Sequence, residues 1–361
     1  MEEKRNKLVI IGNGFDLAHD FKTSYTDFML WYLSKCIKES LIKESYVDKL
    51  LSLKGNYNYS KNEDDLKKTL AKISDFDSVL SYYKIGITRN SAFFDKLIKT
   101  HKEYNWVDIE NEYYQSVISW YNDLVNINNH SRRSSIISSL NSLNEEFEYL
   151  RDKLVEYLEL IQKDVILVHN INTSGKINQL FKKYSQDFLK NDDSKIITFL
   201  NFNYTNTIER YIGKGEDLNH EIIYIHGQLN DPDNPIIFGF GDEVDSYYEK
   251  IENLKINEFL NNFKSFWYFK TDNYQKLLKF IDIEAFDIEI LGHSCGLSDR
   301  VLLSTVFQHK NCQTIKIHYH QRETGNDFFS KTQEISRHFR DKAKMREVIV
   351  DFSKCQSINN A

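Results

Sequence analysis

Residues 8–21 read Leu-Val-Ile-Ile-Gly-Asn-Gly-Phe-Asp-Leu-Ala-His-Asp-Phe, an apolar run that passes directly into two glycines. Such a run predicts a strand buried on both faces. Gly12 and Gly14 let the backbone turn sharply and come close to a ligand, and a helix starting there would offer N–H groups to a phosphate. The stretch predicts the first strand of an α/β sheet, followed by a nucleotide-type site or an ordinary tight turn.

Further short runs with the composition of buried parallel strands follow along the chain, at residues 195–202, 221–225, 236–240, 286–291, 314–318 and 347–351. Most precede a Gly, Asn or Ser loop, which is typical of a doubly wound, mostly parallel, Rossmann-like α/β sheet. We expect residues 1–40 and 191–361 to form this sheet domain. Residues 41–190 show little strand signal and are expected to form a helical insertion lobe.

The clearest element of the lobe begins near Arg132 and repeats apolar residues every three or four positions, at Leu140, Leu143, Phe147, Leu150, Leu154, Tyr157 and Ile161. This spacing predicts a long helix packed inside a bundle, with self-association between chains as the alternative. Residues 53–65 contain a glycine, several Asn and Lys and an acidic run, which predicts an exposed loop.

Charge and composition argue against several classes of protein. The formal net charge is −6, which does not favour nucleic acid or an anionic membrane as a partner. No segment approaches the roughly 20 apolar residues of a membrane span. The four cysteines form no paired motif, so we expect a reducing, cytoplasmic location and no metal.

Polar residues and glycines follow four of the predicted strands. Because the carboxyl ends of parallel strands meet at one edge, where open α/β sheets bind ligands, we expect a shared ligand site there. The residues expected to contact the ligand are Gly12, Asn13, Gly14, Phe15, Thr205, Gly227, Gly292, Ser294 and Asp299.

Asp16 is an unusual residue for a phosphate loop, because its carboxylate would repel a pyrophosphate. We expect it instead to bond a ribose hydroxyl or to polarise a water, with helix capping as the alternative.

Six segments together resemble the AbiH family of bacterial phage abortive-infection proteins: GNGFDLAHDFKTSYTDF (12–28), YNWVDIENEY (104–113), NFNYTNTIE (201–209), YIHGQL (224–229), IIFGFGDE (236–243) and LGHSCGLSD (291–299). AbiH proteins are in turn similar to sirtuin-type nucleotide-binding domains. That second resemblance implies that Asn203 and His226 are the catalytic pair, that Gly12 and Gly14 form the cofactor loop, and that NAD is hydrolysed to deplete the infected cell. Asp16 would assist by stabilising positive charge.

The chain departs from the sirtuin pattern at three positions, where Asn13 replaces an alanine, Asp16 a serine and Thr205 an aspartate. NAD or a related nucleotide such as ADP-ribose is therefore expected as the ligand, with a phage-derived trigger and self-association through the helical lobe. The alternatives are a non-catalytic sensor of such a nucleotide and a nuclease-type effector.

Overall fold

The computed structural model describes residues 4–55, 76–104, 107–127, 130–169, 194–211, 220–241 and 244–358. The chain forms two compact units. The sheet unit comprises Met1–Thr23, Leu158–Glu249 and Phe263–Ala361, and the helical unit comprises Ser24–Tyr157 and Lys250–Asn262. The helical unit differs from the expected lobe of residues 41–190. It begins earlier because the buried side of helix α2, Tyr25–Lys43, packs within it, where Phe28 contacts Tyr157 and Tyr32 contacts Phe94.

Six parallel strands build the sheet unit: β1 Asn6–Ile11, β5 Ile197–Asn201, β6 His220–Tyr224, β7 Phe286–Leu291, β8 Cys312–Tyr319 and β9 Gln356–Ser357. Their order is β6-β5-β1-β7-β8-β9, and each neighbouring pair is parallel. The predicted α/β class with a parallel sheet is confirmed. The chain adds β5 and β6 on one side of β1 and then β7, β8 and β9 on the other. The direction of winding therefore reverses at β1, and open sheets of this kind bind ligands at such a reversal.

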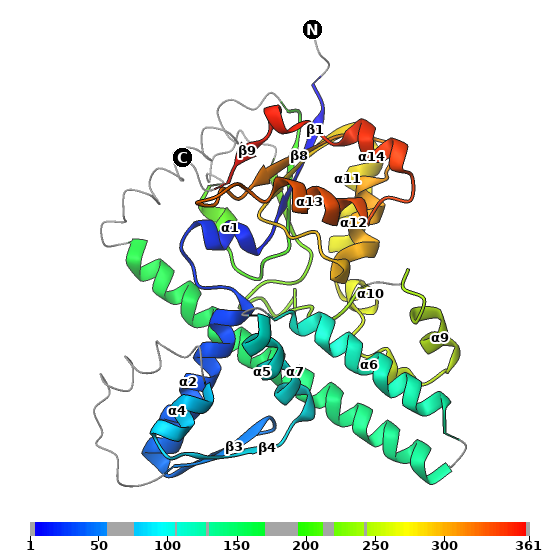
Figure 1. The fold of residues 1–361 in the computed structure, drawn as a ribbon. Coiled ribbons are helices and arrows are strands. Elements are labelled where there is room, and N and C mark those ends of the chain that lie inside the picture. The colour runs from blue at the N-terminus through cyan, green and yellow to red at the C-terminus, as the bar shows by residue number, and fades with distance from the viewer. Residues whose placement is uncertain are drawn as a thin grey trace. The chain divides into compact units, whose positions relative to one another are not determined.

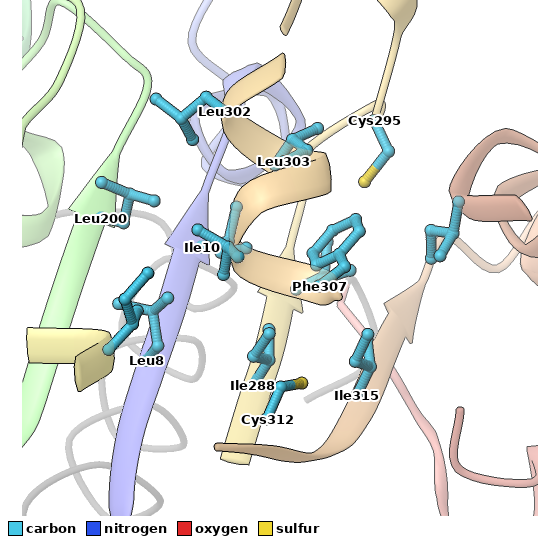
Figure 2. Close-up of a cluster of buried hydrophobic side chains, with 14 of the residues drawn as sticks. Leu8, Ile10, Leu200, Ile288, Cys295, Leu302, Leu303, Phe307, Cys312 and Ile315 are labelled. Atoms are coloured by element: carbon cyan, nitrogen blue, oxygen red, sulfur yellow. The ribbon is translucent and has the colours of Figure 1, made fainter. Parts of the chain in front are cut away.

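Both faces of the sheet are covered. On one face, Leu8 and Ile10 of β1 share a core with four helices, α11 Asn273–Ile283, α12 Arg300–Phe307, α13 Phe328–Ser336 and α14 Lys342–Val348 (Figure 1). Figure 2 shows Leu302, Leu303 and Phe307 of α12 lying over the strands. On the other face, Val9 and Ile11 pack with helix α1, Asn13–Ala18, and with the 3-10 turn η1, Thr207–Arg210. This alternation follows from the two-residue period of a strand.

Two of the predicted strands are wrong. Residues 236–240 form no strand; Ile237 donates its N–H to the His226 carbonyl at 2.8 Å, and Phe240 forms only an isolated bridge with Phe263. Residues 347–351 begin inside α14, whose first N–H groups are capped by the Asp341 carboxylate, and pair with β8 only through an isolated parallel bridge between Ile349 and Ile315. The capped helix is therefore preferred there over the strand that the β-branched residues predicted. The edge strand of the sheet is the two-residue β9 instead.

The helical unit contains α2 Tyr25–Lys43, α4 Phe76–Tyr82, α5 Ala92–Tyr104 and α6 Ile109–Val125, together with most of α7 His130–His169 and α9 Tyr248–Asn253. The predicted seam of α7 is confirmed from Leu140 to Tyr157, where every seam residue is buried, and Phe147 stacks on Tyr113 at 4.1 Å between ring centroids. Ile161 is only partly buried. The seam therefore packs inside the chain, as expected for a bundle helix.

The sequence did not reveal a three-stranded antiparallel sheet in the helical unit, formed by β2 Ser45–Val47, β3 Leu51–Lys54 and β4 Gly86–Arg89. Strands of three or four residues are too short for their alternation to be recognised. The predicted loop at residues 53–65 is wrong at Leu53 and Lys54, which belong to β3, and residues 56–65 lie outside the described residues.

The loops that follow β1 and β7 interlock backbone to backbone. Gly14 donates its N–H to the Gly292 carbonyl at 2.8 Å, and Gly12 donates to the Leu291 carbonyl at 3.0 Å. A Cβ on Gly14 would lie 2.7 Å from the Gly292 oxygen, and one on Gly292 would lie 2.1 Å from the Phe15 nitrogen. Gly292 also has a φ of +71°. Glycine is required here because no side chain fits between the two loops.

Gly292→Ala should destabilise the sheet unit far more than Gly325→Ala. Both glycines have positive φ, +71° and +76°, but a Cβ at Gly325 meets nothing within 4 Å. Gly325→Ala therefore costs only the left-handed backbone penalty, about 1 kcal/mol, whereas Gly292→Ala adds an overpacking cost of about 2 kcal/mol or more. Urea unfolding of both variants measures the difference. Equal losses would show that the loops can separate without cost.

Candidate functional site

The carboxyl edge of the sheet brings together the segments that follow β1, β5, β6 and β7. Asn203, after β5, donates its side-chain N–H to the Gly12 carbonyl at 3.1 Å. The Phe202 ring lies 4.9 Å from the His226 ring and 4.2 Å from the His293 ring, measured between centroids. The segments predicted separately along the sequence thus contact one another at one edge of the sheet.

The asparagines after β5 order the backbone of this edge. The Asn201 side chain accepts the Asn203 N–H at 3.0 Å and donates to the Thr205 carbonyl at 3.2 Å. Both asparagines are buried, with 1% and 8% of their surface exposed. Because a buried amide needs partners, these bonds explain why a poor strand-forming residue ends the strand.

Asp16 is a buried carboxylate with half of its hydrogen bonding satisfied. Thr205 donates to its Oδ2 at 2.5 Å, whereas its Oδ1 has no hydrogen-bond partner within the part of the chain that the structure describes. Burial raises the pKa of Asp16 to about 6, against the opposing hydrogen bonds of Thr205 and Thr207 and the charge of Arg210. Asp16 therefore exchanges a proton close to neutral pH, and it does not cap a helix.

Asp299 is the centre of a second, fully paired group. It ends the 3-10 turn η4, Leu297–Asp299, and stands at the cap position of α12, but its carboxylate does not cap that helix. Its Oδ1 lies 2.8 Å from Lys264 Nζ and 3.1 Å from His226 Nε2, and its Oδ2 lies 3.7 Å from His293 Nε2. All four side chains are at least nine-tenths buried.

The charges in this group follow from that geometry. Burial alone would raise the pKa of Asp299, but the Lys264 ammonium, together with His226 and His293, holds it well below its ordinary value of 3.8. Burial and the Lys264 charge lower the pKa of His226 below 6.5, although Asp299 opposes them. Burial lowers the pKa of His293 to about 3. Asp299 is thus ionised and both histidines are neutral near pH 7.

The tautomer of each histidine is set by its partners. His293 Nδ1 accepts the Cys295 N–H at 2.9 Å, so its proton is on Nε2 and faces Asp299. His226 Nε2 faces the ionised Asp299, which can only accept, so this nitrogen carries the proton and Nδ1 keeps a lone pair. The Tyr268 hydroxyl also lies 3.3 Å from His226 Nε2, and its ring stacks on the imidazole.

Several residues predicted to contact a ligand have structural explanations of their own. The expectation of unpaired N–H groups at α1 is wrong for Gly14 and Phe15, which donate to the Gly292 and Gly12 carbonyls. The Phe15 side chain is 0% exposed in the core. Gly227 has a φ of +86°, and a Cβ there would lie 2.3 Å from the Pro235 oxygen.

Asn13 and Ser294 are exposed, and Asn13 accepts a hydrogen bond from Thr23 at 2.5 Å. Their contacts with a ligand stay a prediction, as do those of Gly12, Thr205 and the remaining members of the expected set.

Lys264, His293 and Tyr268 were missed by sequence reasoning. His293 could have been found, because it directly follows the strand-end Gly292 within a segment already singled out. Lys264 and Tyr268 lie in KSFWYFK, residues 264–270, which has no motif and no predicted strand next to it. They form α10, Lys264–Trp267, and the turn η3, Tyr268–Lys270, and reach the edge only through the fold.

The fold and the site define an α/β protein whose parallel sheet carries a buried Lys–Asp–His cluster at its carboxyl edge. A family model described as "Bacteriophage abortive infection AbiH" matches residues 8–321, and the chain belongs to this family, as its motifs predicted. No curated protein matches the chain. Among the described residues, no helix is both long and apolar enough to span a membrane, and no three His, Cys, Asp or Glu side chains are grouped to hold a metal ion.

Asp16→Asn should change how stability depends on pH. Because the folded pKa of Asp16, about 6, exceeds its ordinary 3.8, the folded state holds the proton more tightly and loses stability as pH rises through this window. The loss amounts to about 3 kcal/mol above pH 6 and is absent in the uncharged Asn variant.

The free energy of unfolding, measured by urea at pH 4 and pH 7.5, checks this. The difference between variant and wild type should move in favour of the variant by about 2.5 kcal/mol between the two pH values, and any pH-independent cost of the buried amide cancels. A difference that is the same at both pH values would show that the pKa of Asp16 is not raised.

Proposed function

We propose that this protein is an anti-phage abortive-infection effector that hydrolyses the N-glycosidic bond of NAD or a closely related nucleotide. The observation that carries the proposal is the buried His226–Asp299 pair, 3.1 Å apart, at the sheet edge where open α/β folds bind ligands. Family membership supports the role in phage defence. The resemblance of the Asn203 and His226 segments to sirtuin-type domains supports the choice of substrate.

The cluster offers a neutral general base, which this reaction requires. The bond between the ribose C1′ and the nicotinamide nitrogen breaks, and nicotinamide leaves with the bonding electrons as a neutral molecule. Water adds its oxygen to C1′ and gives its proton to His226 Nδ1, while Asp299 stabilises the resulting imidazolium through Nε2–H. No acid is needed for the leaving group, because that group is already cationic in the substrate.

Asn203 and Asp16 provide the polar surroundings of the ribose in this proposal. Asn203 uses one of its two side-chain N–H groups on the Gly12 carbonyl, and its amide oxygen can accept from a ribose hydroxyl or orient the water. Asp16 is mostly ionised above pH 6, and its unpartnered Oδ1 can stabilise the positive charge that develops on the ribose. The two carboxylates thus have different tasks, as their pKa values require.

Incubation of the purified protein with NAD, followed by chromatography, tests the proposal. Wild type should release nicotinamide and ADP-ribose. His226→Ala should lower the rate by about 10²- to 10⁴-fold, the usual contribution of a general base, while nucleotide binding is largely retained. Asn203→Ala should also lose turnover. His320→Ala, at an exposed histidine, is the matched control and should keep full activity.

Each negative outcome has a separate meaning. If no product forms, even with phage-infected lysate added as a source of the trigger, hydrolysis is excluded; saturable nucleotide binding without product would then identify a sensor. If His226→Ala loses folding and activity together, as judged by circular dichroism, His226 is structural and its catalytic assignment fails.

A further inference from the structure

We infer that Lys264 is the positioning residue of this site: its ammonium compensates the charge of Asp299 and thereby fixes His226 as a neutral base protonated on Nε2. The chemical use of that base rests on the function proposed above. The arrangement of the three side chains does not, because it is a property of the folded protein alone.

The geometry singles out one carboxylate oxygen. Lys264 Nζ lies 2.8 Å and His226 Nε2 3.1 Å from the same Oδ1 of Asp299. The Lys264 side chain is 1% exposed, and lysine is almost never buried to this extent unless it is paired. Asp299 and Lys264 are therefore held together as an ion pair, and His226 binds to the oxygen that this pair shares.

The backbone fixes the place from which Lys264 reaches Asp299. Lys264 donates its N–H to the Phe240 carbonyl at 3.0 Å, and Val301 donates to the Gly241 carbonyl at 3.5 Å. A Cβ on Gly241 would lie 2.7 Å from the Ser298 oxygen and 3.5 Å from the Lys264 Cβ. The segments that bear Lys264 and Asp299 are therefore both held against the backbone of residues 240–241.

The charge balance explains what Lys264 does. With the ammonium present, Asp299 stays ionised and accepts a hydrogen bond from the Nε2–H of His226. The Nδ1 atom of His226 then keeps its lone pair. Without it, the buried carboxylate would be uncompensated, and the nearest group able to supply a positive charge is His226. A protonated His226 could not act as a base.

The other groups facing this pair do not replace Lys264. Tyr268 faces His226 Nε2 with a neutral hydroxyl. His293 lies 3.7 Å from the other oxygen of Asp299, and burial together with the charge of Lys331 opposes its protonation. Among the residues that the structure describes, Lys264 is thus the cation that compensates Asp299.

NMR titration of the histidine side chains in the 15N-labelled full-length chain tests this inference without a substrate. The His226 signal is assigned by its loss in His226→Gln. In Lys264→Met, the pH at which His226 is half protonated should rise by at least about one unit, a tenfold change in proton affinity. Lys344→Met is the control; this partly buried lysine donates to the Cys312 carbonyl, away from Asp299, and should leave the titration unchanged.

An unchanged His226 titration in Lys264→Met would overturn the inference. If Lys264→Met does not fold, Lys264→Met combined with Asp299→Asn should fold, because it removes both buried charges; failure of that rescue would also overturn it. A shifted titration in a protein that does not hydrolyse NAD would leave the inference standing and reject only the proposed function. Hydrolysis by Lys264→Met with the wild-type pH profile would reject the inference alone.

Discussion

The close approach of two loop backbones at the centre of the sheet is the constraint on which the site depends. β1 lies between β5 and β7, and the loops that leave β1 and β7 touch at Gly14 and Gly292 with no room for a side chain. The same contact places Gly12 against His293 and presents its carbonyl to Asn203. Three segments that are distant in sequence are thereby fixed within hydrogen-bonding distance, and the polar cluster follows from this packing.

The two aspartates of this edge have opposite pKa shifts although both are buried. Asp16 and Asp299 are both buried, yet the pKa of Asp16 is raised to about 6 and that of Asp299 lies well below 3.8. The difference comes from their partners: hydroxyl groups do not compensate a buried charge fully, whereas a lysine ammonium does. Two carboxylates at one edge thus differ in pKa because only Asp299 has a buried ammonium beside it.

The buried ion pair is costly as a source of stability, because desolvation offsets most of the attraction between Lys264 and Asp299. Such a pair is useful where it orients a histidine, and His226, which stacks on Tyr268, lies 3.1 Å from the same carboxylate oxygen. Asp16 is also costly to bury, since its Oδ1 has no hydrogen-bond partner among the described residues. Both buried carboxylates stand at the edge where open α/β sheets bind ligands.

The sequence by itself determined the parallel sheet, because strands such as Leu8–Ile11 are continuous apolar runs that only burial on both faces accommodates. It also determined that Asn203, His226 and Asp299 share one edge, since each follows such a strand. It could not separate strand from helix at 347–351, where the Asp341 cap decided, nor recognise strands as short as Ser45–Val47. Only the tertiary structure brought Lys264 to Asp299. That pairing depends on where the backbone of Lys264 is held and on the length of its side chain, and the local sequence shows neither the position nor the partner.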